Sequence, residues 1–181
     1  ALGQARIFAF SMGGRRGGRG IRRTVPILPD WTFEMRGVAV HSRMQITVDP
    51  ERFQRKTDEE VKLAAGTKFE PVYALSQGAR LSGRVVSDAG APIEGALVAI
   101  ERTNERGRFQ RMAGAFMGLE NRTAVSDAQG GFALYGIEPG AATATATKDG
   151  WVQAKSGEQA FVEGGVIEGL ELRMGSGTAV A

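Results

Sequence analysis

The apolar residues of this chain fall in short runs, and turn sequences separate the runs. Strands are predicted at residues 81–86 (Leu-Ser-Gly-Arg-Val-Val), 96–100 (Ala-Leu-Val-Ala-Ile) and 132–135 (Phe-Ala-Leu-Tyr). Turns such as Asp88-Ala-Gly-Ala-Pro and Asp127-Ala-Gln-Gly-Gly combine an Asp that binds its own backbone with a Gly that adopts a positive φ. Strands at intervals of about 8 to 12 residues, with almost no helical periodicity, predict an antiparallel β-sandwich.

The same pattern occurs twice along the chain. Residues 24–38 lie over residues 123–137 at a constant offset of 99. This register aligns Phe33 with Phe132, and both rings are expected to occupy equivalent core positions. Residues 2–9 align with the second copy at an offset of 91, and the difference of 8 indicates an insertion in one loop of that copy. The chain is therefore predicted to be a tandem repeat.

One pair of strands fixes which side chains face the core. Residues 142–147 alternate Ala and Thr, which predicts a strand with one small-residue face and one hydroxyl face. In the first copy, Met, Ile and Val alternate within residues 44–48. An offset of 98 places these three side chains on the alanine face, whereas 99 would reverse the strand. We therefore expect an offset of 98 for this stretch.

The two copies predict two domains of unequal completeness. The first spans residues 1–77 and has no counterpart of the opening strand at residues 81–86, whereas the second spans residues 78–174. Residues 175–181 are expected to be either the start of a further repeat or a linker. The sequence is therefore expected to be a piece of a longer tandem array. The missing strand is expected to leave an unpaired sheet edge beside residues 5–10.

The motifs of the second copy resemble a known family. In order they are Ser82-Gly-Arg-Val-Val-Ser-Asp-Ala-Gly-Ala-Pro, Thr123-Ala-Val-Ser-Asp-Ala-Gln-Gly-Gly-Phe and Lys148-Asp-Gly-Trp. Together they are similar to a carboxypeptidase regulatory-like domain over most of residues 79–174. The first copy departs from the pattern, with Trp31-Thr-Phe in place of the Gly-Gly-Phe turn.

The resemblance implies an all-β fold, with two tandem Greek-key antiparallel β-sandwiches of the transthyretin-like (prealbumin-like or Ig-like) type, the first lacking its opening strand. It also implies a non-catalytic module of a bacterial extracytoplasmic protein, at the cell surface, secreted or periplasmic. Such domains act as spacers, adhesion modules or accessory domains.

The charge of the chain is concentrated in one loop. The net charge is +3, yet residues 1–29 contain six arginines and no acidic residue. Five of these guanidinium groups form a glycine-rich candidate polyanion-binding loop: Arg15, Arg16, Arg19, Arg22 and Arg23. An acidic glycan, a lipid headgroup or an acidic protein surface would fit it, and so would a solvated spacer without a ligand. Nucleic acid is disfavoured, because no aromatic side chain lies between Ser11 and Leu28 for a base to stack on.

The corresponding loop of the second copy is longer and different. Within residues 101–121, Met112, Phe116 and Leu119 fall at helical spacing, which is typical of a short helix covering the sandwich. The alternative is a set of exposed anchors for a partner protein: Met112, Phe116 and Met117. Because both copies expand the same loop, this end of each sandwich is the predicted functional surface.

Catalysis and cofactor binding are not predicted. The chain has no cysteine and one histidine, His41, so neither a Ser-His-Asp set nor a His-rich or thiolate metal site can be assembled. No apolar run approaches the ~20 residues of a membrane helix. We therefore expect a structural or interaction module that spaces or assembles parts of a larger surface complex or filament. The expected partners are other domains of the same longer chain or other protein copies. The alternatives are a module that binds anionic polymers through the arginine loop, and an accessory domain of a secreted peptidase.

Overall fold

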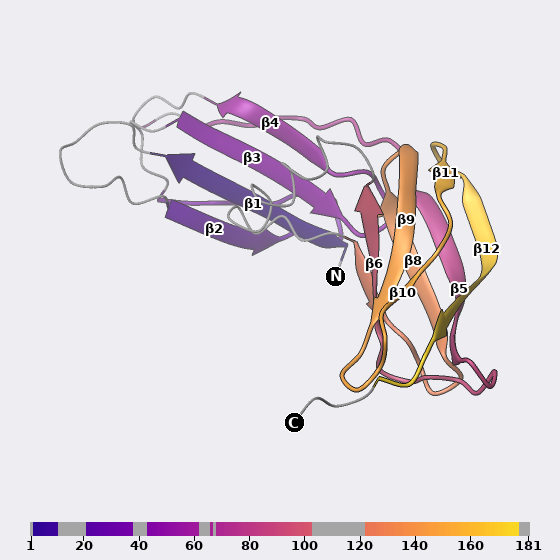
Figure 1. The fold of residues 1–181 in the computed structure, drawn as a ribbon. Helices are drawn as coiled ribbons and strands as arrows, with labels where there is room; N and C mark the ends of the chain where they lie inside the picture. Colours follow the sequence, from indigo (N-terminus) through magenta and orange to yellow (C-terminus); the bar gives the residue numbers. More distant parts are fainter. Residues whose placement is uncertain are drawn as a thin grey trace. The chain divides into compact units, whose positions relative to one another are not determined.

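The computed structural model describes residues 2–10, 21–37, 43–61, 66, 68–102 and 122–177. In these ranges the chain forms twelve β-strands and no helix, so the predicted all-β class is confirmed (Figure 1). The chain divides into two compact units, Ala1–Ser76 (unit 1) and Gln77–Ala181 (unit 2).

Unit 1 contains one antiparallel sheet with the strand order β2-β1-β3-β4 (Figure 1). Its strands are β1 (Gly3–Phe10), β2 (Ile21–Pro26), β3 (Arg43–Pro50) and β4 (Lys56–Val61). β1 is an inner strand, because Ala5 pairs with Val25 on one side and with Val48 on the other. The expectation of an unpaired edge beside residues 5–10 is therefore wrong.

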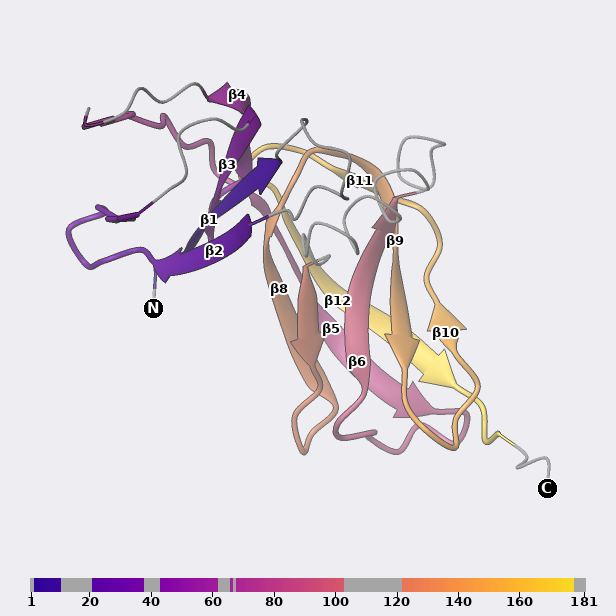
Figure 2. The ribbon, with the colours of Figure 1, turned by 90° about the vertical axis from the view of Figure 1, so that its left-hand side faces the viewer.

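Unit 2 is a two-layered sandwich. Its strands are β5 (Ala79–Ser87), β6 (Leu97–Arg102), β7 (Thr123–Val125), β8 (Gly131–Ile137), β9 (Gly140–Thr147), β10 (Ala154–Lys155), β11 (Gln159–Phe161) and β12 (Val166–Met174). One sheet has the order β10-β9-β6-β7, with β11 also paired to β9, and the other has the order β12-β5-β8. β5 and β12 lie side by side in Figure 2 and are parallel, which is a departure from the expected antiparallel pairing.

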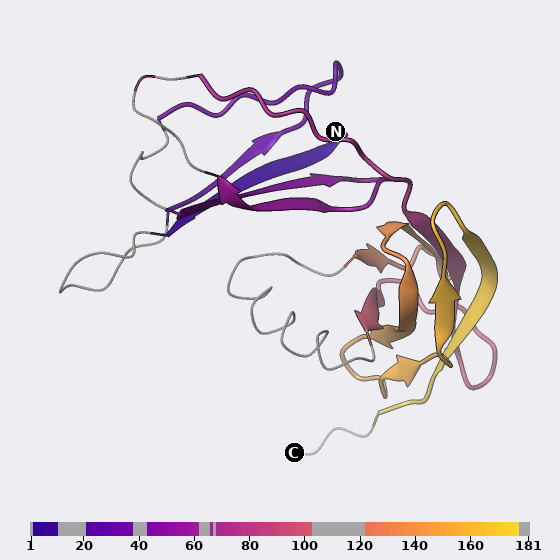
Figure 3. The same cartoon turned by 90° about the horizontal axis from the view of Figure 1, so that it is seen from above.

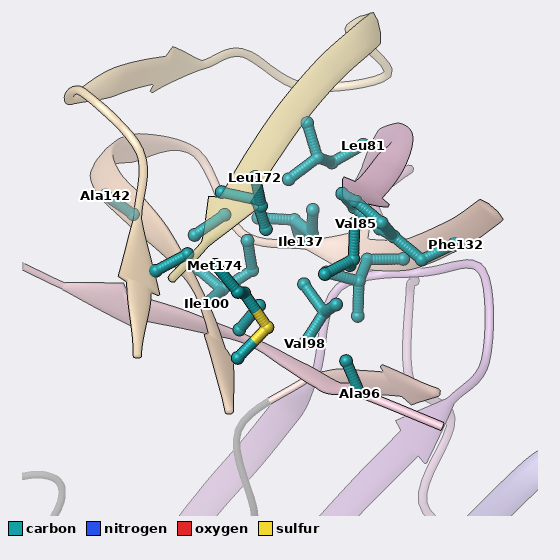
Figure 4. Packing of buried hydrophobic residues seen from close by; sticks show 14 of the residues in the cluster. Leu81, Val85, Ala96, Val98, Ile100, Phe132, Ile137, Ala142, Leu172 and Met174 are labelled. Carbon is teal, nitrogen blue, oxygen red and sulfur yellow. The ribbon is translucent and has the colours of Figure 1, made fainter. Parts of the chain in front are cut away.

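The core of unit 2 forms where the two sheets face each other (Figure 4). Leu81 and Val85 of β5 point toward Val98 and Ile100 of β6, and burial of each such side chain contributes about 1.5–3 kcal/mol. Three alternate alanines of β9 are at most 1% exposed and belong to this core, which confirms the predicted small-residue face: Ala142, Ala144 and Ala146.

The strand faces of unit 1 follow the predicted offset of 98. Ile46 and Val48 of β3 belong to the hydrophobic core of unit 1, and their counterparts Ala144 and Ala146 of β9 belong to that of unit 2. Equivalent backbone hydrogen bonds support the same register. Gln54 donates to Ser76 in unit 1, and Val152 donates to Gly175 in unit 2, each at 2.9 Å. The sheet β2-β1-β3-β4 thus repeats the sheet β7-β6-β9-β10.

β1 of unit 1 corresponds to β6 of unit 2, but at an offset other than the expected 91. The Ile27 N–H donates to the Gly3 carbonyl at 3.1 Å, and the Ser126 N–H donates to the Ala96 carbonyl at 2.9 Å. These bonds match β1 to β6 at an offset of 93, so the expected 91 is wrong by two residues. Both offsets are odd, so the predicted faces of the strand are unchanged.

The turn before residue 33 is also repeated. Trp31 has a φ of 63°, close to the 74° of Gly130. No other non-glycine residue in the described ranges has a positive φ. The Trp31 N–H donates to Leu28 at 2.9 Å, and the Gly130 N–H donates to Asp127 at 2.8 Å. Unit 1 therefore keeps the turn with a residue that disfavours its backbone conformation.

The second layer of unit 1 contains no strand in the described ranges. By the offset of 99, residues 32–37 correspond to β8 and residues 68–76 to β12, yet both segments are irregular. Figure 3 shows the two segments on the same side of the four-stranded sheet. In unit 2 the strand between β8 and β12 is β5, and no described strand of unit 1 corresponds to it. The side chains of Phe33 and Tyr73 meet across this position, with ring centroids 6.5 Å apart.

Candidate functional site

The arginine-rich loop connects β1 to β2, and only its end lies in the described residues. Arg15, Arg16 and Arg19 lie outside them. Arg22 belongs to β2, where its backbone is in register with Phe8 of β1. Arg23 follows it with an exposed side chain. Binding of a polyanion by the five arginines therefore stays a prediction.

Arg23 has a structural partner within unit 1. Its guanidinium donates a hydrogen bond to the carbonyl of Arg36, beside Gly37. In unit 2 the Arg122 Nε donates to the carbonyl of Gly136 at 3.1 Å. Gly37 and Gly136 have nearly the same φ, 67° and 66°. The two arginines thus hold the same bend of the chain in each unit, a role that the charge pattern alone did not indicate.

The long loop of unit 2 starts and ends at two anchored arginines. Met112, Phe116 and Met117 lie outside the described residues, so their role as partner anchors stays a prediction. At the start of the loop, Arg102 donates to the carbonyls of Glu138 and Pro139, each at 3.0 Å. At its end, Arg122 binds Gly136. One end of the loop is therefore fixed to the connection between β8 and β9, and the other to the end of β8.

The second layer of unit 1 has no described strand between residues 32–37 and 68–76, whereas the sequence predicts an unpaired edge beside β1. Phe33, Met35, Tyr73 and Leu75 are half-buried against the core of the four-stranded sheet. The Tyr73 hydroxyl is buried and has no hydrogen-bond partner among the described residues. Burial raises the pKa of Tyr73 to about 12, and the charge of Asp58 acts in the same direction. A buried phenol without a partner is a site of unsatisfied hydrogen bonding.

Reactive groups do not converge in the part of the chain that the structure describes. No three His, Cys, Asp or Glu residues of these ranges are placed to hold a metal ion. The same ranges contain no helix that is long and apolar enough to cross a membrane.

Comparisons with solved structures give distant similarities. The minor pilin GBS52 of Streptococcus agalactiae is 10% identical, with a TM-score of 0.39 over 99% of this chain and 85% of that chain. The shaft pilin SpaA of Lactobacillus rhamnosus GG is 11% identical, with a TM-score of 0.36 over 99% and 90%. A chain of a type II cohesin–X-dockerin complex of Acetivibrio cellulolyticus is 20% identical, with a TM-score of 0.36 over 55% of this chain. The present chain spans 58% of its length. No curated protein matches the sequence.

A comparison with protein families matches residues 80–175 to the carboxypeptidase regulatory-like domain. The matched residues extend from β5 to the end of β12 and therefore contain both sheets of the unit 2 sandwich. They make up more than half of the chain and include each motif that carries the resemblance. The chain belongs to the carboxypeptidase regulatory-like domain family.

Proposed function

We propose that this chain is a non-catalytic structural and interaction module of an extracytoplasmic protein, in which tandem units space or assemble other parts. The observation that carries the proposal is the repetition of one four-stranded sheet, β2-β1-β3-β4 and β7-β6-β9-β10, with equivalent hydrogen bonds. Repetition of a scaffold adds length and surface to a protein.

The buried polar groups support a structural role. Four polar residues of the described ranges are buried as a whole, and each carries a hydroxyl group: Thr47, Ser126, Thr143 and Thr145. Ser126 donates to the Ile93 carbonyl at 2.7 Å and accepts from the Ala96 N–H at 2.8 Å. These bonds hold the start of β6 in place.

The extracytoplasmic location is part of the same proposal. Membership of the family supports it, since the resemblance implies tandem domains of secreted or surface proteins. Protease treatment of intact cells that carry the tagged native protein tests the location. Cleavage within this chain on intact cells is expected, and recovery of the protein only from the cytosol would refute the proposed location.

A deletion and a replacement in the native protein test the function. Removing residues 1–177 should prevent assembly of the flanking parts and leave any enzymatic activity of those parts unchanged. An unrelated sandwich of similar length should restore assembly if the chain is a spacer, and should fail if its surface binds a partner. Loss of a neighbouring peptidase activity with assembly intact would refute the proposal and support the accessory-domain alternative.

A further inference from the structure

The turn at residues 28–32 of unit 1 has the same hydrogen bonds as its counterpart in unit 2. The Leu28 N–H donates to the Thr32 carbonyl at 2.8 Å, and the Trp31 N–H donates to the Leu28 carbonyl at 2.9 Å. The equivalent bonds of residues 127–131 in unit 2 measure 2.9 and 2.8 Å. The backbone of the turn therefore belongs to the repeated scaffold, and its different side chains are specific to unit 1.

Two residues that favour this turn in unit 2 are replaced by large apolar residues in unit 1. By the offset of 99, Leu28 takes the place of Asp127, whose carboxylate accepts two backbone N–H groups of the turn. Trp31 takes the place of Gly130 and has a φ of 63°, a conformation that a bulky residue rarely adopts. Leu28 is 44% exposed and Trp31 is 49% exposed. Neither the backbone of the turn nor burial in the core explains these two side chains.

Phe53 supports the indole ring of Trp31. The centroids of the two rings lie 5.3 Å apart and their planes are at 90°, which is an edge-to-face contact. Phe53 is half-buried and, by the offset of 98, takes the place of Trp151, which packs against the core of unit 2. An edge-to-face contact covers at most one face of an indole ring. Phe53 therefore fixes the Trp31 ring and leaves its other face uncovered.

The residues on either side of Trp31 supply a hydrogen-bond acceptor. The Asp30 Oδ1 accepts the Thr32 N–H at 3.1 Å and the Thr32 hydroxyl at 2.7 Å. The hydroxyl and the N–H of Thr32 lower the pKa of Asp30, so the exposed carboxylate is ionised and only accepts hydrogen bonds. Because both of these bonds go to Oδ1, Oδ2 can accept a bond from a ligand.

A pyranose ring with equatorial hydroxyl groups fits both features. Its faces carry axial C–H bonds, which stack on the electron-rich face of an indole ring, and its rim carries O–H donors for a carboxylate. A proline-rich segment also stacks on aromatic side chains. Proline has no N–H, however, and carbonyl acceptors find no complement in the ionised carboxylate of Asp30. The polar groups therefore favour a sugar over a peptide.

We propose that the turn at residues 28–32 binds a pyranose unit of a β-gluco-configured glycan, with Trp31 as the stacking ring and Asp30 as a hydrogen-bond acceptor. The site uses none of the five arginines of the candidate polyanion-binding loop. Glycan binding is an activity beyond the spacing or assembly role proposed above and does not depend on it.

The test uses the full chain with Trp151→Phe, so that Trp31 is the one tryptophan that remains. Cellohexaose or hexa-N-acetylchitohexaose should give a saturable change in its fluorescence, with a Kd of about 0.1–1 mM. Binding of cellohexaose alone would identify a glucan as the ligand, and binding of the second probe alone an amino-sugar glycan. The proposal is overturned if neither probe binds at concentrations roughly tenfold above this range. Binding of deca-L-proline in place of both sugars would also overturn it and would indicate a peptide partner.

Variants separate a binding role of the turn from a structural one, with binding measured by titration calorimetry. Trp31→Gly should weaken binding at least tenfold and change the Tm of unit 1 by only a few degrees, because glycine suits the positive φ and this offsets the lost contact with Phe53. Asp30→Asn keeps an oxygen for the bonds of Thr32 but replaces the second acceptor with a donor, so it should weaken binding at an unchanged Tm. The matched control is Phe69→Ala, which removes another exposed aromatic ring of unit 1 and should leave the Kd unchanged. Equal losses for Phe69→Ala and Trp31→Gly would refute a site at the turn, and this result would not affect the deletion test of the proposed function.

Discussion

Replacement of Gly83 by alanine tests the close packing at the centre of the unit 2 sandwich. A Cβ at this position would lie 1.9 Å from the carbonyl oxygen of Leu170 in β12 and 2.9 Å from the ring of Phe132 in β8. The ring can tilt, but the carbonyl belongs to the backbone of β12. The pairing of β12 with β5 is already irregular between Ile167 and Leu170. The added methyl group therefore has to push β12 away from β5.

The size of the effect follows from two costs. Overpacking of a close-packed interior costs about 1–3 kcal/mol. Displacement of β12 also weakens one or two ladder hydrogen bonds, at about 1 kcal/mol each. We expect Gly83→Ala to lower the free energy of unfolding of unit 2 by about 2–5 kcal/mol. For a domain of roughly 100 residues, this corresponds to a fall in Tm of about 8–40 °C.

The chain offers a separate probe for each unit. It contains two tryptophans, Trp31 in unit 1 and Trp151 in unit 2. In a Trp31→Phe background, urea denaturation followed by fluorescence reports unit 2 alone. Gly157→Ala is the matched control, because nothing lies within 4 Å of its added Cβ. Its effect should stay within about 0.5 kcal/mol of zero. Equal effects of the two substitutions would refute the close contact between β5 and β12.

Three further predictions concern unit 1 and its comparison with unit 2. Phe132→Ala should cost unit 2 about 3–5 kcal/mol, and Phe33→Ala should cost unit 1 less, about 1–2, because the Phe33 ring is only half-buried. Equal costs in the two denaturation curves would contradict this difference. Because the pKa of Tyr73 is higher in folded unit 1 than in the unfolded chain, the protonated side chain contributes stability that is fully present below about pH 10. This contribution is lost as the pH rises toward 12. The urea midpoint should therefore fall over this range, and Tyr73→Phe, but not Tyr135→Phe, should reduce the fall. If the loop binds a polyanion, retention on heparin should weaken steeply between low and physiological salt. It should be lost when glutamine replaces Arg15, Arg16, Arg19, Arg22 and Arg23. Unchanged retention after that replacement would indicate that the loop is a spacer without a ligand. Arg23→Gln alone should lower the Tm of unit 1, because the Arg36 carbonyl then loses its hydrogen-bond donor.

The fold class and the strand faces could be predicted from the sequence because each rests on local alternation. The Ala/Thr pattern of β9 identifies the face that joins the hydrophobic core, and the offset of 98 places Ile46 and Val48 on the same face of β3. The offset of β1 could not be fixed in this way. Side chains alternate every two residues along a strand, so a shift by two leaves the hydrophobic pattern unchanged. The hydrogen bonds to Gly3 and Ala96, and the equivalent pairing of Ala5 and Val98 with their neighbouring strands, distinguish 93 from 91.

The position of the open layer could not be predicted because it depends on strand order. The sequence indicates that a strand precedes β6, and the simplest expectation places neighbouring strands side by side. In unit 2, β5 instead belongs to the opposite sheet and lies between β8 and β12. The same topology gives the parallel pairing of β5 with β12. A local pattern contains no information on which sheet a strand joins, so the gap in unit 1 was expected beside β1.

The register of the repeat also divides the arginine loop into two kinds of residue. Arg23 aligns with Arg122 at the offset of 99, and each binds a backbone carbonyl next to or at a glycine with positive φ. An arginine that recurs at the same position of both units and makes the same contact is explained by the scaffold. Arg15, Arg16 and Arg19 lie within the loop and are not explained in this way. Arg23 therefore has a structural contact that is repeated in unit 2, and binding of a polyanion by the five arginines stays a prediction.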